Sequence, residues 1–269
     1  MLRLRSAKGA LRQWPDDDDI GLADFIYYRD FDKNETLKLD LHMPPESDQR
    51  KRRPAIVVIH GGGFTRGSKG DPKLPHGARN FVANDFVVIS INYRLSKEMS
   101  AVANGYAAKD ARAAVRWLVK NGDAYCIDTK RIGAFDASAG AATTAFRCVV
   151  PDEGHSGNPS HPSNITVGVA LSAALWPKKW DYINANSKPY LDFRGTADKV
   201  VSYYAATENA QRMMTNHIRH STINDLIPFE GEGHVPTDAL EAHRVDVMDF
   251  LTKRMDLDGA ECPTPTAVV

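Results

Sequence analysis

The chain has 269 residues, of which 34 are basic and 34 are acidic, so its formal net charge is zero. A general electrostatic attraction to nucleic acid needs a basic excess or a basic face, and this composition supplies no excess. Hydrophobic residues make up 42% of the chain and charged residues 25%, values that exclude disorder over its whole length. No apolar run approaches the ~18 residues of a membrane span. A soluble globular protein is therefore predicted.

The ends of the chain and its cysteines bear on organisation and compartment. Three cysteines are too few and too scattered for a disulfide framework or a zinc site, and their odd number suits a reducing compartment. Residues 1–20 are first basic and then acidic, without the apolar stretch of a signal peptide. We expect a flexible arm there and a cytoplasmic location; an organelle transit peptide is the alternative. One domain is expected over residues 21–257, followed by a tail over residues 258–269.

Strands and helices alternate along the expected domain. Leu37, Leu39 and Leu41 alternate with polar residues and follow a turn signal, which predicts an opening pair of strands. Strands are predicted over residues 25–31, 37–43, 55–60, 86–93, 131–136, 165–173, 190–194 and 222–229, and helices over residues 107–121, 139–149, 201–216 and 237–255. This alternation indicates an α/β fold with a mostly parallel central sheet of about eight strands and helices on both faces.

A glycine run follows one of the predicted strands. In a sheet of this kind the loops at the carboxyl ends of the strands lie along one edge, where ligands bind. The segment His60-Gly61-Gly62-Gly63 can turn its backbone N–H groups toward a common point and bind an oxyanion or a phosphate. The run lacks the lysine and hydroxyl residue of a phosphate-binding P-loop. A tight turn without further function is the alternative.

A serine, an acid and a histidine occupy later strand ends. Ser138 lies in a turn of small residues between a strand and a helix, where it is either a raised nucleophile or a helix N-cap. Asp198 and His234 each follow a later strand, and each alone is a weak signal. Together they give the order Ser, Asp, His.

With these residues in this order, the chain resembles enzymes of the α/β-hydrolase fold, of the esterase and lipase type. It is most similar to small carboxylesterases with a His-Gly-Gly-Gly loop, including hormone-sensitive-lipase-like and acetyl- or feruloyl-esterase-like groups. The likeness extends from about Leu37 to the last helix. It includes the segment Asn92-Tyr93-Arg94-Leu95 and the helix that contains Asp110 and Trp117.

The resemblance implies a serine hydrolase that cleaves carboxylic esters through an acyl-enzyme. Ser138 would be the nucleophile, His234 the general base and then acid, and Asp198 the group that orients His234. The oxyanion hole would consist of the N–H groups of Gly62, Gly63 and Ala139, supported by Gly61 and by His60 as a structural rather than a catalytic histidine. No metal or organic cofactor is implied. The expected partner is a small-molecule ester, with no nucleic acid and no membrane span; the oligomeric state is not predicted.

One residue departs from the family pattern, which has glycine two positions before the serine where this chain has Asp136. Three interpretations stay open. The carboxylate bonds locally and leaves the chemistry intact, or it lies close enough to His234 to raise the pKa of that histidine. In the third, the turn is distorted and the protein is a catalytically weak binding protein. A further alternative keeps the triad but cleaves amides, peptides or formamides.

Other histidines and aromatic residues are weaker candidates. His217 and His220 have no acid or cysteine nearby to complete a metal site, and His243, expected inside the last helix, is a reserve for His234. The segment from Trp176 to Lys188 is too short for a large lid, which favours short acyl chains. Its aromatic residues Trp176, Trp180 and Tyr182 are expected either to line the acyl or alcohol pocket or to pack over the sheet edge.

Overall fold

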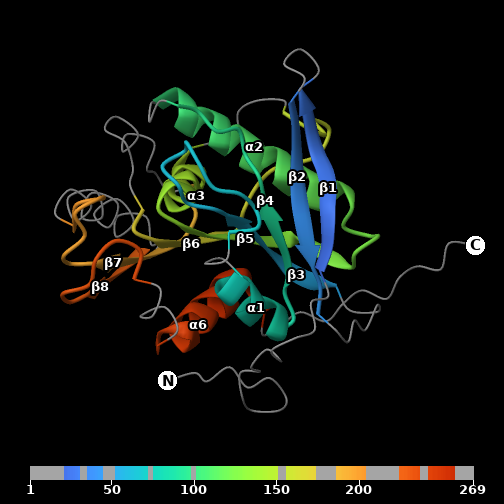
Figure 1. Cartoon of the computed structure of the whole chain (residues 1–269). Coiled ribbons are helices and arrows are strands. Elements are labelled where there is room, and N and C mark those ends of the chain that lie inside the picture. The colour runs from blue at the N-terminus through green and yellow to red at the C-terminus, as the bar shows by residue number, and fades with distance from the viewer. Residues whose placement is uncertain are drawn as a thin grey trace, which may run out of the picture.

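An eight-stranded sheet lies at the centre of the computed structural model, with helices on both of its faces (Figure 1). The structure describes residues 21–30, 35–44, 52–71, 75–97, 101–150, 156–173, 186–203, 224–236 and 242–257. The strands are β1 (Gly21–Asp30), β2 (Glu35–His42), β3 (Arg53–Ile59), β4 (Val87–Ile91), β5 (Ile127–Ala137), β6 (Val167–Leu171), β7 (Tyr190–Gly195) and β8 (Asn224–Phe229). The helices are α1 (Pro75–Ala83), α2 (Ala101–Lys120), α3 (Ala139–Val149) and α6 (Arg244–Met255).

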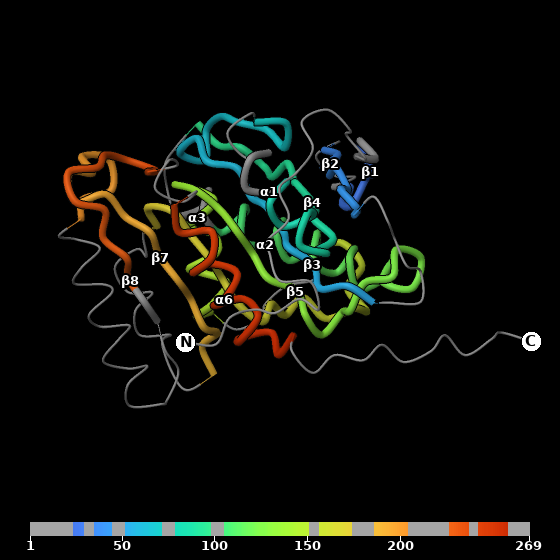
Figure 2. The backbone as a smooth tube through the Cα atoms, turned by 90° about the horizontal axis from the view of Figure 1, so that it is seen from below, coloured from blue at the N-terminus to red at the C-terminus, as the bar shows by residue number. Residues whose placement is uncertain are grey.

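The strands follow the order β1-β2-β4-β3-β5-β6-β7-β8, and Figure 2 shows β1 and β8 at opposite edges. β1 pairs antiparallel with β2, and β2 pairs antiparallel with β4. From β4 to β8 every neighbouring pair is parallel. The predicted α/β class and its mostly parallel sheet of about eight strands are therefore confirmed.

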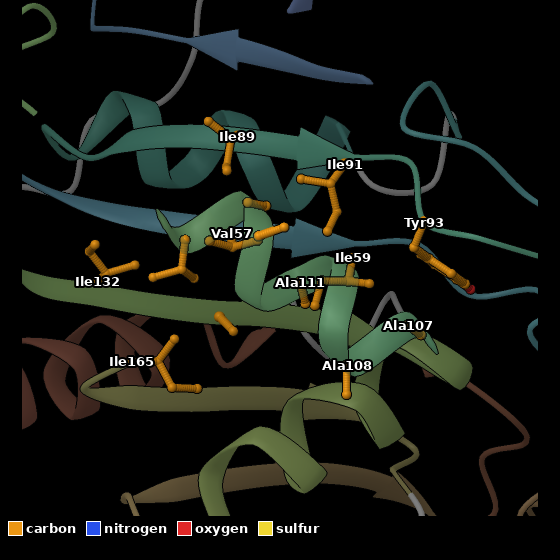
Figure 3. Close-up of a cluster of buried hydrophobic side chains, with 14 of the residues drawn as sticks. Val57, Ile59, Ile89, Ile91, Tyr93, Ala107, Ala108, Ala111, Ile132 and Ile165 are labelled. Atoms are coloured by element: carbon orange, nitrogen blue, oxygen red, sulfur yellow. The ribbon is translucent and has the colours of Figure 1, made fainter. Parts of the chain in front are cut away.

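Two apolar cores form because successive side chains of the central strands point to opposite faces. On one face, Ile59 packs with Ala111 of α2 in a cluster that also includes residues of α3 (Figure 3). On the other face, Val58 lies in a cluster with Leu251 of α6 and residues of α1. Figure 1 shows α2 and α3 on one side of the sheet and α1 and α6 on the other. The strands β3 and β4, covered on both sides, consist almost wholly of buried residues.

Most predicted elements are present, with shifted ends. The helix predicted over residues 139–149 matches α3, whereas α2 begins six residues earlier than the pattern indicated. The strand predicted over residues 165–173 is shorter, because Ser172, just past β6, turns the chain with a positive φ of 58°. Helix α1 was not predicted. The arm, the tail and most of the helix predicted over residues 201–216 lie outside the described residues.

The parallel arrangement brings distant segments to one edge of the sheet. β3, β5, β6, β7 and β8 run in the same direction, so the residues that follow their last positions share that edge. These following residues are His60, Ser138, Ser172, Thr196 and Glu230. In the described part of the chain, no helix has both the length and the apolar character needed to span a membrane.

Candidate active site

Ser138 lies in a sharp turn between β5 and α3. Its φ of 54° and ψ of −116° are unusual for a residue with a side chain, and they direct the chain from the strand into the helix within one residue. Its N–H donates to the carbonyl of Leu171 (2.9 Å), which fixes the turn to the end of β6. Although Ser138 occupies the N-cap position of α3, its side chain makes no capping hydrogen bond. The hydroxyl is therefore available for another partner.

Gly140 allows α3 to start directly against the end of β3. A Cβ at this position would lie 2.8 Å from the carbonyl carbon of Ile59 and 3.0 Å from the carbonyl oxygen of His60, and closer still to the oxygen of Ile59. Because these atoms belong to backbone, no side-chain rearrangement relieves the contact. Glycine at this position therefore keeps the serine turn and the glycine run close together.

The structure brings Ser138, Asp198 and His234 together from three separate loops. The Nε2 atom of His234 lies 2.9 Å from Oγ of Ser138, and Nδ1 of His234 lies 2.8 Å from Oδ2 of Asp198. The carboxylate accepts only, so Nδ1 carries the imidazole hydrogen, and Nε2 accepts the hydrogen of the serine hydroxyl. The three residues thus form one continuous chain of hydrogen bonds.

Asp198 is held in place on both of its oxygens. Oδ1 accepts hydrogen bonds from the N–H groups of Val200 and Val201, each 2.9 Å long, while Oδ2 accepts from His234. Burial by itself raises the pKa of Asp198, but the hydrogen bonds from His234 and from the two N–H groups outweigh it and leave the pKa below the usual range. The side chain is fully buried, so an ionised carboxylate faces His234 without water between them.

Ser172, which the sequence did not indicate as a site residue, holds the loop that carries His234 in place. Ser172, fully buried just past β6, accepts a hydrogen bond from the N–H of Val235 at 3.0 Å. Ser172 in turn donates its own N–H to Phe193 of β7 (2.8 Å). A serine directly after a strand gives no signal that distinguishes it from an ordinary loop residue.

The acid loop and the histidine loop are also joined through their backbones. The N–H of Ala197 donates to the carbonyl of Glu232 (2.9 Å), and the N–H of Gly231 donates to Oγ1 of Thr196 (2.9 Å). A Cβ on Gly195 would meet the backbone of Glu232, so glycine is needed where the two loops touch. This contact and the two hydrogen bonds hold the acid loop and the histidine loop close together.

The glycine run curls beside the serine turn. Gly62 and Gly63 have positive φ values of 105° and 62°, a conformation that favours glycine. A Cβ on Gly61 would lie 3.4 Å from Cβ of Ser138, so the run abuts the turn. Within the described residues, no protein acceptor takes the N–H groups of Gly62, Gly63 or Ala139. These three donors could therefore bind an oxyanion.

His60, the first residue of the run, is almost fully buried and has a structural environment. Its Nδ1 donates to the carbonyl of Gly61 (2.7 Å), and its ring stacks on that of Tyr93 with 4.3 Å between the centroids. The hydroxyl of Tyr93 donates to the carbonyl of His60 at 3.0 Å. Burial lowers the pKa of His60, so the ring is neutral at pH 7.

Asp136 is fully buried and bonds locally. Its Oδ1 accepts a hydrogen bond from the N–H of Ile59, the residue directly before His60. Neither oxygen is paired with His234, whose two ring nitrogens contact Ser138 and Asp198. Of the three interpretations of this residue, local bonding is the one that matches these contacts.

His243, the reserve for His234, is not part of this hydrogen-bond chain. The expectation that His243 lies inside the last helix is wrong: α6 begins at Arg244, and His243 precedes it with non-helical φ and ψ of −104° and 14°. Its Nδ1 pairs with Asp246 (2.6 Å). His217 and His220 lie outside the described residues, and within the described ones no group of three potential metal ligands gathers.

The order of the strands and the sharp turn after β5 are those of the α/β-hydrolase fold, which the solved structure described below shares. Residues 39–173, half of the chain, match the BD-FAE family model. The chain belongs to this family, a family of α/β-hydrolase esterases. The resemblance inferred from the loop residues is thereby confirmed.

Two curated relatives are esterases that are much longer than the segment that matches this chain. The chain is 33% identical over 104 residues to Esterase B1 from Culex pipiens and 32% identical over 105 residues to Esterase LipI from Mycobacterium tuberculosis. These alignments cover 36% and 39% of this chain, but only 19% and 32% of the two relatives. The chain thus spans between about a fifth and a third of the length of these curated relatives.

A solved structure matches over most of both chains. An esterase from Thermogutta terrifontis in its propionate-bound form superimposes with a TM-score of 0.73 and 23% sequence identity. The match covers 90% of this chain and 96% of that one. At this level of identity the likeness establishes the fold.

Proposed function

We propose that this chain is a serine hydrolase that cleaves carboxylic esters, with Ser138, His234 and Asp198 as its catalytic triad. The observation that carries the proposal is the unbroken chain of hydrogen bonds from the serine hydroxyl through His234 to the buried carboxylate. Membership in an esterase family supports the same bond type. A role limited to binding would not need an activated hydroxyl at the end of such a chain.

In the first half of the reaction, Oγ of Ser138 attacks the ester carbonyl carbon while its proton moves to Nε2 of His234. The resulting imidazolium is stabilised by the ionised carboxylate of Asp198, which also keeps the ring oriented through Nδ1. His234 then gives the proton to the departing alcohol oxygen. An acyl group remains bound to Ser138.

Negative charge develops on the carbonyl oxygen during this attack. The N–H groups of Gly62, Gly63 and Ala139 are the donors proposed to stabilise it, because all three are free of protein acceptors within the described residues. The N-terminus of α3, directly after Ser138, adds its partial positive charge at the same point.

In the second half, water replaces the alcohol. His234 takes a proton from this water, hydroxide attacks the acyl carbon, and the proton returns to Oγ of Ser138 as the carboxylic acid leaves. The balance is one ester and one water giving one acid and one alcohol. No step uses a cofactor.

Short acyl groups are the proposed substrates. Solved structures of the Thermogutta terrifontis esterase hold propionate and butyrate, and one is phosphorylated by paraoxon. The sequence favours the same range for this chain, because the expected lid segment is short. The aromatic candidates for the acyl or alcohol pocket, Trp176, Trp180 and Tyr182, lie outside the described residues.

The test is hydrolysis of 4-nitrophenyl esters graded from acetate to palmitate, by the wild type and by Ser138→Ala and His234→Ala. We expect turnover that is highest for acetate to butyrate and that falls by at least about 10⁴-fold in each variant. An amide and a formamide tested in parallel address the alternative bond types. Ester turnover that persists in Ser138→Ala would contradict the proposal.

A further inference from the structure

Asp136 links the two loops that must face each other for the proposed reaction. It pairs with Ile59 as the last partners on the ladder between β3 and β5. Beyond this pair, β3 continues into His60 and the glycine run, and β5 continues through one residue into Ser138. A side chain at this position therefore touches the starting points of both loops.

The carboxyl group makes one hydrogen bond and is otherwise enclosed. Oδ1 accepts from the N–H of Ile59, while Oδ2 is buried and has no hydrogen-bond partner within the described residues. The residue is 0% exposed. Gly140 touches the same Ile59 backbone from α3, so the end of β3 is held from two sides.

The surroundings of Asp136 disfavour the charged form of its carboxyl group. Burial raises its pKa well above the usual value, the hydrogen bond from Ile59 opposes this only in part, and Arg147 acts weakly in the same opposing direction. The other ionisable groups that face it are Tyr93 after β4, Cys148 of α3 and Tyr190 of β7. All three have raised pKa values, so none of them adds a negative charge at neutral pH.

We propose that Asp136 is a positioning residue. Through the hydrogen bond from the N–H of Ile59, it holds the glycine run, which carries the proposed oxyanion donors, against the serine turn. The proposal rests on the proposed esterase function and adds to it a residue that touches neither the substrate nor the triad. The glycine that the family pattern has at this position cannot make the bond. In this chain the carboxyl group instead sets the direction in which the backbone leaves β3.

The test compares substitutions that keep or remove the acceptor. Asp136→Asn has the shape of the protonated acid and keeps an oxygen for the N–H of Ile59, whereas Asp136→Leu has a similar size and no acceptor. We expect Asp136→Leu to lower kcat about 10- to 100-fold with KM changed less than threefold, because a displaced oxyanion donor acts in the transition state. Asp136→Asn should keep kcat within threefold of the wild type.

Two further variants separate positioning from general stability. Ile132→Ala, on the same face of β5, removes buried volume without touching Ile59 and should lower Tm with kcat unchanged. Asp136→Gly also removes the acceptor, and its kcat should fall like that of Asp136→Leu even if the leucine variant does not fold. Every kcat is measured with a short-chain 4-nitrophenyl ester on protein shown to be folded by circular dichroism.

The inference is overturned if Asp136→Leu and Asp136→Gly keep kcat within threefold of the wild type, or if Asp136→Asn falls as far as they do. An equal loss of kcat in Ile132→Ala at a matched loss of Tm would overturn it too. Failure of the proposed function has a different signature: the wild type itself would show no ester turnover, or Ser138→Ala would retain it.

Discussion

Replacing Gly140 by alanine adds one methyl group at the point where α3 meets the end of β3. The new Cβ would lie 2.8 Å from the carbonyl carbon of Ile59, where two non-bonded carbons need about 3.5 Å. The start of α3 or the glycine run must therefore move by at least about 0.7 Å. Because Ser138 lies two residues before this position, the movement separates the serine from the N–H groups of the glycine run.

The size of the effect follows from that displacement. A shift of about 1 Å in catalytic geometry costs up to about 10²-fold in rate, so we expect kcat to fall by roughly 10- to 100-fold. Overpacking of a buried site adds a loss of about 1–3 kcal/mol in the free energy of unfolding. We expect the variant to stay folded at 25 °C, so the loss of kcat reflects the changed geometry of the site and not the loss of folded protein.

The matched control is Gly105→Ala in α2, where an added Cβ meets no atom within 4 Å. Alanine is the better helix former, so this variant should gain about 0.5–1 kcal/mol of stability and keep the kcat of the wild type. Steady-state hydrolysis of 4-nitrophenyl butyrate and urea unfolding are measured for both variants. A Gly140→Ala variant with the wild-type kcat would refute the reasoning about the close backbone contact.

Three further predictions concern Ser172, Asp136 and the buried pair of Arg94 and Asp110. In Ser172→Ala the N–H of Val235 loses its acceptor. The loop that carries His234 is then less well positioned, so kcat should fall about tenfold with KM nearly unchanged. Steady-state kinetics that show an unchanged kcat would exclude a positioning role for Ser172. The raised pKa of Asp136 means that the folded state keeps a proton that the unfolded state releases above pH ~4, so stability falls as pH rises from there toward the folded pKa. Asp136→Asn removes this pH dependence. Urea unfolding at pH 5 and pH 8 should show the stability of the variant rising relative to that of the wild type by up to about 1.4 kcal/mol per pH unit; a stability difference that is independent of pH contradicts the raised pKa of Asp136. Arg94 donates hydrogen bonds to both oxygens of the fully buried Asp110, through its side chain and its backbone N–H. Arg94→Ala should therefore lower the free energy of unfolding by about 3–5 kcal/mol, and a loss under 1 kcal/mol by urea unfolding would show that the pair is not needed for stability.

The residues with a chemical signature could be located from the sequence. Ser138, Asp198 and His234 follow strands in a fixed order, and parallel strands bring such positions to one edge. The sequence could not indicate whether their side chains meet at hydrogen-bond distance, because that depends on how the loops pack. Contacts such as that between Gly195 and the backbone of Glu232 determine it, and they arise only in the folded chain.

Residues that support the site through one contact escaped prediction. Ser172 acts through a single hydrogen bond to a residue far away in sequence, so no local pattern marks it. Among the residues of helix α1 whose burial is described, Phe81 and Val82 are the only large buried apolar ones, too few for a helical period to stand out. The early start of α2 was hidden by Asn104 and Gly105, which are poor helix formers.

The most direct test of the central claim is labelling of the folded protein with a fluorophosphonate, followed by peptide mass spectrometry. The reagent reacts with an activated serine and requires no knowledge of the substrate. We expect the label on Ser138, its absence in Ser138→Ala, and its strong reduction in His234→Ala, because the hydroxyl then lacks its base. Folded wild-type protein that remains unlabelled, or that is labelled at another serine, would contradict the account.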